Sequence, residues 1–199
     1  MPSEPARGPA PGAVVLTGGG GVRLGGADKA SIEVGGRTLL EHTLEALRDV
    51  GEVVVVGPDV PTSRPVTFTR EEPVGGGPAA GLLAGLHRFA RRPEHVVVLA
   101  VDMPLVTPDT VARLLRAAAG SDGAVLVDGD GRLQYLCAAY SVGALERARA
   151  SSGAEEGHGL AMGRLVGDLV LARVEAVGSE ARDLDTWADL ATLRETFGG

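Results

Sequence analysis

The sequence predicts an α/β fold, with a doubly wound, mostly parallel sheet and helices on both faces. Several short apolar runs lack the alternation of polar and apolar residues, which is typical of strands covered on both faces. Segments with helical periodicity alternate with these runs, and this alternation indicates the doubly wound arrangement. The expected strands of the sheet are residues 13–16, 53–56, 96–101, 124–127 and 169–174.

End signals support the expected helices. Thr38 and Glu41 have the spacing of a capping box, and Gly51 provides a stop at the far end. Thr107 stands where an N-cap is expected, with Pro108 in the first helical position and a glycine after the end. The expected helices are residues 38–50, 79–89, 107–119, 142–150 and 186–197.

One stretch departs from this alternation. Apolar runs on either side of Asp128-Gly129-Asp130-Gly131 indicate a hairpin within residues 123–140, a small antiparallel excursion. Residues 151–159 are small and polar, so we expect a mobile loop there. Residues 1–12 are rich in Pro, Gly and Ala and predict a disordered tail, which leaves residues 13–199 as a single domain.

Composition narrows the range of partners. The chain has 199 residues, a formal net charge of −7 and 3% aromatic residues. This charge argues against binding to nucleic acid or to an anionic membrane, and so few rings argue against stacking on single-stranded nucleic acid. No apolar run approaches the length of about 20 residues that spans a bilayer. The single cysteine, Cys137, is expected in the core, and it favours a reducing compartment, the cytoplasm.

A glycine-rich segment from Leu16 to Lys29 directly follows the first expected strand. Consecutive glycines cost backbone entropy, and in return they let backbone N–H groups approach a ligand closely. A concave run of such groups binds phosphate oxygens. Arg23 and Lys29 add positive charge at the two ends of the loop, and we expect Lys29 to be a solvent-facing phosphate ligand. The expected nucleotide-binding residues of this segment are Leu16, Thr17, Gly18, Gly19, Gly20, Gly21, Gly26 and Lys29.

The spacing excludes two commoner nucleotide loops. A Walker loop has Ser or Thr after its lysine at a helix start, whereas Lys29 precedes Ala30 and residues 31–34 intervene before the helix. A dinucleotide fingerprint needs a helix directly after the glycines and an acidic residue at the end of the second strand. The second strand here ends at Val56, before a Gly-Pro pair. An oxidoreductase of the NAD type is therefore disfavoured.

The full pattern of the loop resembles the signature of the molybdenum cofactor guanylyltransferases and their relatives in the sugar-nucleotide-transferase superfamily. Residues 71–81 resemble the family's segment with an acid, Gly-Pro and Ala-Gly. Residues 98–104 resemble its strand that ends in Asp-x-Pro, and residues 183–190 resemble its C-terminal motif. The resemblance covers residues 13–195, strongly in the first half and thinly after Tyr140. It implies the Rossmann-type fold of the nucleotide-diphospho-sugar transferases.

Asp102 is the principal candidate for a metal ligand. It follows a buried strand, at the edge of the sheet where α/β folds bind ligands, and a carboxylate there can hold Mg²⁺ beside phosphate oxygens. The alternative is a turn acid before Pro104, and the resemblance favours the metal. The resemblance also implies Asp185 as a second ligand. Asp185 could instead cap the last helix, where Thr186 and Asp189 have capping-box spacing.

Opposing signals bear on the donor base. The opening Thr17-Gly18-Gly19 resembles the guanylyltransferases. Asp183 and Asp185 stand where these enzymes usually have Asn and where cytidylyltransferases more often have Asp. We give the loop more weight, because it lies beside the base in this family, and expect GTP rather than CTP.

The remaining candidates concern the nucleoside and the acceptor. Before the second helix, Gly77 and Pro78 could contact a base edge or the ribose, and the resemblance implies an acidic contact from Glu71 or Glu72. A phosphorylated acceptor needs cations. The residues expected to face it are Arg132, Gln134, His158 and Arg164.

The resemblance implies a nucleotidyltransferase that moves GMP from GTP to a terminal phosphate of the molybdopterin cofactor, with Mg²⁺ as cofactor and pyrophosphate as product. Arg23, Lys29 and Asp102 are the implied catalytic residues. The alternatives are CTP as donor, another phosphorylated acceptor, or a nucleotide-binding module without turnover.

Overall fold

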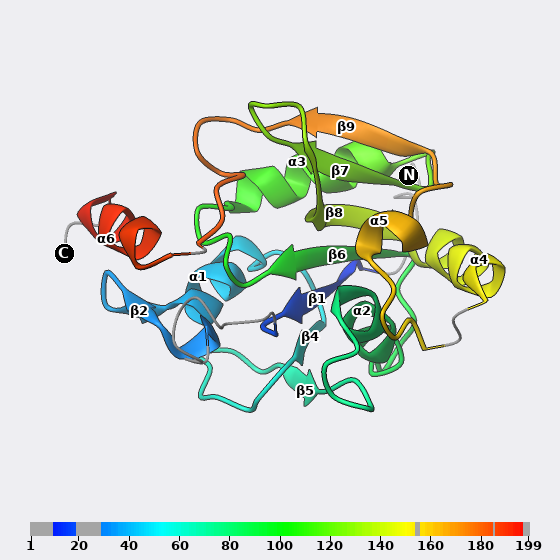
Figure 1. The fold of residues 1–199 in the computed structure, drawn as a ribbon, viewed down its shortest axis with the longest axis horizontal. Coiled ribbons are helices and arrows are strands. Elements are labelled where there is room, and N and C mark those ends of the chain that lie inside the picture. The colour runs from blue at the N-terminus through cyan, green and yellow to red at the C-terminus, as the bar shows by residue number, and fades with distance from the viewer. Residues whose placement is uncertain (1–9, 19–28, 154–155, 185, 197–199) are drawn as a thin grey trace, which may run out of the picture.

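The computed structural model describes residues 10–18, 29–153, 156–184 and 186–196 (Figure 1). Within these residues, seven strands form one sheet: β1 (Gly12–Leu16), β4 (Val53–Val56), β5 (Thr67–Thr69), β6 (His95–Ala100), β7 (Gly123–Val127), β8 (Leu133–Ser141) and β9 (Leu171–Glu175). Their order in the sheet is β5-β4-β1-β6-β8-β7-β9. β8 runs antiparallel to β6 and β7, and the other neighbours pair in parallel.

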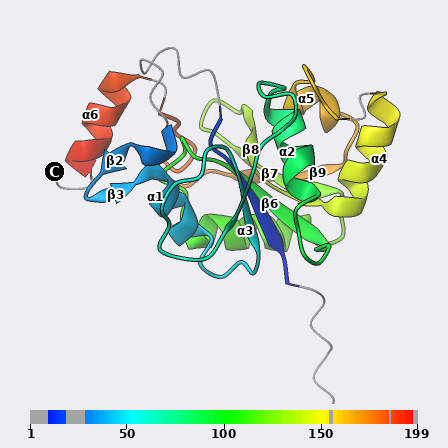
Figure 2. The ribbon, with the colours of Figure 1, turned by 90° about the horizontal axis from the view of Figure 1, so that it is seen from below.

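Helices cover both faces of this sheet (Figure 2). The core on one face includes side chains of α1 (Leu39–Ala46) and α3 (Pro108–Ala118). The core on the other face includes side chains of α2 (Pro78–Leu86), α4 (Val142–Ser152) and α5 (Met162–Leu165). The predicted α/β fold with a mostly parallel sheet is therefore confirmed, and so is the antiparallel excursion, which is the β7–β8 hairpin.

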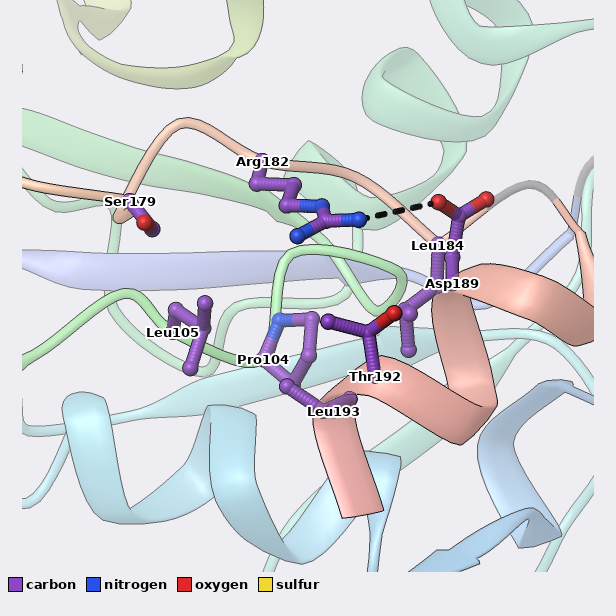
Figure 3. Close-up of a pocket in the computed structure, with 8 residues that line it drawn as sticks. All are labelled: Pro104, Leu105, Ser179, Arg182, Leu184, Asp189, Thr192 and Leu193. Carbon is purple, nitrogen blue, oxygen red and sulfur yellow. Dashed lines mark hydrogen bonds and ion pairs between the residues drawn. The ribbon is translucent and has the colours of Figure 1, made fainter. Parts of the chain in front are cut away.

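Small elements that the sequence did not predict lie beside the sheet. A short helix, η2 (Lys29–Ser31), leads into a two-stranded hairpin of β2 (Glu33–Val34) and β3 (Arg37–Thr38). The C-terminal helix α6 (Trp187–Thr196) lies beside this hairpin in Figures 1 and 2. Leu193 of α6 shares a small groove with Pro104 of the loop after β6 (Figure 3).

The helix caps agree with the sequence in part. Thr107 and Thr110 form a reciprocal capping box at the start of α3, so the predicted N-cap is confirmed. The capping box predicted for α1 is only half formed. Thr38 accepts the Glu41 N–H at 3.2 Å, but the Glu41 carboxylate bonds the backbone N–H and hydroxyl of Ser63 at 2.7 and 2.5 Å. The predicted N-cap is therefore confirmed, and only the reciprocal bond from Glu41 was predicted wrongly, because Ser63 competes for its carboxylate.

Several element ends also differ from expectation. α1 ends at Ala46, and a turn rather than helix continues to Asp49. α4 extends to Ser152, so the start of the expected 151–159 loop is helical. β1 begins at Gly12, the last residue of the expected tail. No helix in the described part of the chain is both long enough and apolar enough to cross a membrane.

Helix α2 packs very closely on the sheet. A Cβ added at Gly85 would lie 2.8 Å from Cγ1 of Val14, and one at Gly81 would lie 3.2 Å from Cδ2 of Leu16. These glycines therefore let the helix backbone approach β1. As a result, the start of α2 lies directly beside the end of β1.

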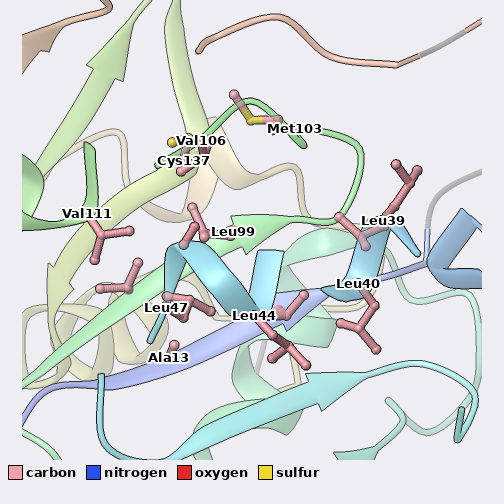
Figure 4. Packing of buried hydrophobic residues seen from close by; sticks show 14 of the residues in the cluster. Ala13, Leu39, Leu40, Leu44, Leu47, Leu99, Met103, Val106, Val111 and Cys137 are labelled. Carbon is pink, nitrogen blue, oxygen red and sulfur yellow. The ribbon is translucent and has the colours of Figure 1, made fainter. Parts of the chain in front are cut away.

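The core is almost entirely aliphatic (Figure 4). On the α1 face, Leu39 and Leu44 of α1 pack toward Ala13 of β1 and Leu99 of β6. Cys137 of β8 is fully buried in the same cluster, as expected.

Cys137 is expected to resist alkylation by iodoacetamide in the folded protein near neutral pH. Burial raises the pKa of its thiol to about 12, since a thiolate would lose its hydration there, and the thiolate is the nucleophile. Mass spectrometry after treatment with and without denaturant measures the labelling. Equal labelling rates in both conditions would contradict the burial of this side chain.

Candidate functional site

The carboxyl ends of the parallel strands meet at one edge of the sheet. Leu16 at the end of β1 pairs with Val56 of β4 and with Ala100 of β6. The segments that follow these strands therefore emerge side by side, and ligands of open α/β sheets bind outside such ends. Asp128 follows β7 at the same edge, because β7 is antiparallel to β8 and β8 is antiparallel to β6.

An open groove of about 500 Å³ lies at this edge, between the end of β1 and the start of α2. Its volume is in the range of about 300–1,000 Å³ that is usual for small-molecule sites. It brings together several residues predicted to bind the nucleotide, from segments far apart in sequence. The lining residues are Leu16, Gly18, Val56, Glu71, Val74, Gly75, Gly77, Pro78 and Gly81.

Thr17 is not among the residues that line the groove, unlike its neighbours Leu16 and Gly18. Its side chain is buried, and its hydroxyl donates to the Val56 carbonyl at 3.1 Å. Its backbone N–H also donates to that carbonyl, at 3.1 Å. Thr17 thus links β1 to β4 below the groove.

The loop before α2 forms one wall of the groove. The Glu71 carboxylate accepts the backbone N–H of Gly75 at 3.1 Å, which closes the loop on itself. Gly77 has a φ of 91°, a conformation that favours glycine, and it leads directly into Pro78 at the first position of α2. Glu71 lines both the groove and a second cavity, whereas Glu72 lines the second cavity but not the groove.

Lys29 and Asp102 form an ion pair at the same edge of the sheet. The Lys29 ammonium donates to Oδ2 of Asp102 at 2.8 Å and to the Leu184 carbonyl at 3.2 Å. The exposed fractions of the two charged side chains are 11% for Lys29 and 25% for Asp102. The expectation of a solvent-facing Lys29 was therefore wrong: the C-terminal segment and the end of β6 enclose the side chain.

Lys29 is also the only lysine of the chain, and all other formal cations besides histidine are arginines. An ammonium is a compact charge with rotatable donors, which suits simultaneous contact with several oxygen atoms. In this structure the oxygens that it contacts include those of the Asp102 carboxylate and the Leu184 carbonyl. The same donors are suited to phosphate oxygens.

Asp102 fits a Mg²⁺ site as a single carboxylate ligand. Mg²⁺ commonly takes one or two protein carboxylates and completes its shell with water and substrate phosphates. Asp102 offers one such carboxylate at the ligand-binding edge. Among the described residues, no group of three or more His, Cys, Asp or Glu side chains could hold a metal ion by itself. The fit is to a metal that arrives with a polyphosphate.

Some predicted site residues lie outside the described residues. They are Gly19, Gly20, Gly21, Arg23, Gly26 and Asp185. The neighbours of Asp185 form the capping box whose spacing the sequence showed. The Asp189 carboxylate accepts the Thr186 N–H at 2.9 Å, and the Thr186 hydroxyl accepts the Asp189 N–H at 3.2 Å. Thr186 and Asp189 thus cap α6.

Two of the residues expected to face the acceptor lie together at the β7–β8 turn. Asp128 accepts the Arg132 N–H and the Gln134 side-chain amide, both at 2.9 Å. The Arg132 backbone N–H bond is the main reason why the pKa of Asp128 is lowered. The Arg132 guanidinium is largely exposed and lies 3.5 Å from Asp130. Gln134 is held close to the backbone turn, at the sheet edge that also carries Asp102.

His158 lies in a different place, against the loop of the groove. Its Nε2 is 2.9 Å from the Glu72 carbonyl, and the neighbouring Gly159 N–H donates to the Gly76 carbonyl at 2.9 Å. Arg164 is exposed on α5. The structure therefore does not gather the expected acceptor residues into one cluster: Arg132 and Gln134 share the β7–β8 turn, and His158 braces the loop.

A family model described as the MobA-like NTP transferase domain matches residues 13–168. One curated relative is named "Probable molybdenum cofactor guanylyltransferase" and comes from Methanosarcina acetivorans. It is 31% identical over 206 residues, which cover 96% of this chain and 91% of the relative.

Solved structures of known proteins share the fold. A molybdopterin-guanine dinucleotide biosynthesis protein A from Archaeoglobus fulgidus aligns with a TM-score of 0.72 and 22% identity, covering 94% of this chain and 98% of that one. A 2-C-methyl-D-erythritol 4-phosphate cytidylyltransferase from Thermus thermophilus aligns at 0.68 and 25%, with the same coverage. A Mycobacterium tuberculosis protein in complex with manganese aligns at 0.67 and 21%, covering 95% of this chain and all of its own.

Proposed function

The chain belongs to the family of MobA-like NTP transferase domains, and we propose that it moves GMP from GTP to a terminal phosphate of the molybdopterin cofactor. One observation carries the proposal. A groove with a glycine-rich entrance and an ion pair of Lys29 with Asp102 lie at the same edge of the sheet. This arrangement suits a nucleoside at one end and its phosphates at the other.

The proposed reaction needs little acid–base chemistry. An oxygen of the acceptor phosphate, already ionised at neutral pH, attacks the α-phosphorus of the triphosphate. The bond from the α-phosphorus to its bridging oxygen breaks, and that oxygen leaves with the pyrophosphate. Catalysis then consists mainly of orienting the groups and neutralising charge.

Lys29 supplies the positive charge that this reaction needs. We propose that its ammonium exchanges the Asp102 and Leu184 oxygens for phosphate oxygens and stabilises the departing pyrophosphate. Asp102, released from the pair, would hold Mg²⁺, together with Asp185 as a second ligand. When bound, the metal supplies charge neutralisation at the phosphates. Arg23 is proposed to contact the triphosphate at the other end of its loop.

The groove offers the nucleoside an apolar surface and backbone polar groups. Leu16 and Val56 lie at its base, and Val74 stands 73% exposed at its margin. Glu71 carries an acceptor that could bind donors of a guanine edge or ribose. These features support a flat base as occupant of the groove.

CTP is the second candidate donor. Asp183, with Asp185, favours it, since the cytidylyltransferases more often have Asp at these positions. The fold is common to both groups, because the Thermus thermophilus neighbour is named as a cytidylyltransferase. The opening of the glycine-rich loop, Thr17-Gly18-Gly19, favours GTP. Guanine has N1–H and N2–H₂ donors, and protein carbonyls that accept from them would be left unpaired with another base.

GTP is expected to bind more tightly than CTP in the presence of Mg²⁺. Each buried polar group left unpaired by the wrong base costs about 1–3 kcal/mol, so the preference could reach about a hundredfold. Isothermal titration of each triphosphate measures the two dissociation constants. Tighter binding of CTP would replace the guanylyl assignment with a cytidylyl one.

The phosphorylated acceptor is proposed to bind beside Arg132 and Gln134. Arg132 and Gln134 lie at the carboxyl edge of the sheet, where a phosphorylated acceptor would approach Asp102. We propose the cytoplasm as the compartment and small anions, rather than nucleic acid or membrane, as the partners. A nucleotide-binding module without turnover is the remaining alternative, and product analysis with GTP, Mg²⁺ and molybdopterin cofactor distinguishes it.

A further inference from the structure

Glu180 is a buried acid outside the groove and outside the predicted site. Only 6% of its surface is exposed. One carboxylate oxygen accepts the Thr110 hydroxyl of α3 at 2.5 Å. The other accepts the Val177 N–H at 2.8 Å and a guanidinium N–H of Arg113. A buried carboxylate with this many donors is well satisfied.

Arg113 extends these contacts to neighbouring elements. Its guanidinium also donates to the Glu175 carbonyl at the end of β9, at 2.9 Å, and to Asp109 at 3.1 Å. The hydrogen bond to Glu180 is the largest reason why the pKa of Arg113 is raised. The Arg113–Glu180 pair thus fixes the start of the segment after β9 onto α3.

That segment leads within a few residues to the site. The Arg182 N–H donates to the Ser179 carbonyl at 3.0 Å, and the Arg182 guanidinium contacts Asp189 of α6 at 3.3 Å (Figure 3). Leu184 is hydrogen-bonded to Asp102 and Lys29 through its backbone N–H and carbonyl. Its N–H donates to the Asp102 carbonyl at 2.8 Å, and its own carbonyl accepts the Lys29 ammonium.

We propose that Glu180 is a positioning residue for the Lys29–Asp102 pair, which it holds in place through the backbone of Leu184. The proposal rests on the proposed function, because it assigns the pair to catalysis. Glu180 does not contact the groove, so its loss should leave triphosphate affinity almost intact. What it should change is the geometry of the pair, and thus the rate of the chemical step.

Two measurements on Glu180→Gln test this proposal. The amide keeps the shape of the side chain but removes the charge that Arg113 binds. Amide hydrogen exchange of Leu184, followed without substrate, is expected to accelerate relative to the amides of β6. In the transfer assay, kcat is expected to fall about tenfold while KM for the triphosphate stays within about twofold, as for an outer-shell partner of a site.

Glu146→Gln is the matched control. Glu146 of α4 also binds an arginine, Arg92 of the loop before β6, through both oxygens, but this pair is exposed. The control is expected to keep the kcat of the native protein and its exchange at Leu184. Should Glu180→Gln not fold, Arg113→Lys replaces that variant in both measurements. Lysine keeps a cation beside Glu180 but lacks the guanidinium that also reaches the Glu175 carbonyl.

The outcomes are distinct. Unchanged exchange at Leu184, or accelerated exchange with native kcat, overturns the proposal. A parallel loss of melting temperature and triphosphate affinity shows a role in global stability alone and also overturns it. If the native protein releases no pyrophosphate with any donor, the proposed function fails. The positioning claim is then decided by Leu184 exchange and by whether Mn²⁺ binding weakens in Glu180→Gln.

Discussion

Replacing Lys29 with alanine is expected to lower the rate of nucleotidyl transfer about a hundredfold, since loss of one charge-assisted contact in the transition state costs on the order of 3 kcal/mol. Lys29 is the only lysine of the sequence, and its ammonium contacts Asp102 after β6 and Leu184 of the C-terminal segment. Steady-state kinetics with saturating triphosphate and acceptor measures the loss.

The same substitution should also reduce stability. Lys29 is 11% exposed, and its removal leaves Asp102 and the Leu184 carbonyl without this donor. The expected cost is about 1–3 kcal/mol, which thermal unfolding measures. Arg92→Ala is a control that removes one cation from the exposed pair of Arg92 with Glu146 of α4. Near-native turnover of Lys29→Ala would remove this residue from the mechanism.

Replacing Asp102 with asparagine is expected to raise the Mg²⁺ concentration needed for half-maximal activity by at least about tenfold. Even mutating a residue that only hydrogen-bonds a metal ligand commonly lowers metal affinity by about that factor. A neutral amide is a poorer ligand for a hard cation than a carboxylate. Titration of Mg²⁺ at fixed triphosphate measures the change. Asp185→Asn should have a milder effect, because the resemblance to guanylyltransferases implies that Asn is usual at that position.

Asp122→Asn is the matched control for Asp102. Both carboxylates are 25% exposed, and both accept a cationic side chain at 2.8 Å, in Asp122 that of Arg147. Asp122 precedes β7 and therefore lies at the opposite edge of the sheet. If Asp102→Asn and Asp185→Asn both leave the Mg²⁺ dependence unchanged, the nucleotide alone holds the metal and the proposed ligands are wrong.

Most of the sheet and of its covering helices were predictable because their signals are local, although the edge strand β5 and the short helix α5 were not predicted. Unbroken apolar runs marked β1, β4, β6 and β7, and cap residues such as Thr107 marked helix starts. The competing partner of Glu41 could not be predicted, because Ser63 approaches it only in the folded chain. The β2–β3 hairpin was missed since each of its strands has only two residues.

The sequence proposed the residues of the candidate site but not how they are arranged. Lys29 and Asp102 were assigned separate roles, but in the structure they are hydrogen-bonded to each other. This pairing could not be predicted, because the two residues are 73 positions apart in sequence. Leu184 acts through its backbone, so no side chain marked it. Glu180 looks like one of many acids in the C-terminal part of the sequence, and only the fold reveals that it is buried against Arg113.

Pyrophosphate release tests the central claim most directly. The native protein is incubated with Mg²⁺, molybdopterin cofactor and each common ribonucleoside triphosphate in turn, and pyrophosphate is assayed against samples that lack the acceptor. With GTP, we expect pyrophosphate release that depends on the acceptor and equals the amount of nucleotide-bearing product. Absence of acceptor-dependent pyrophosphate with every triphosphate would contradict the central claim.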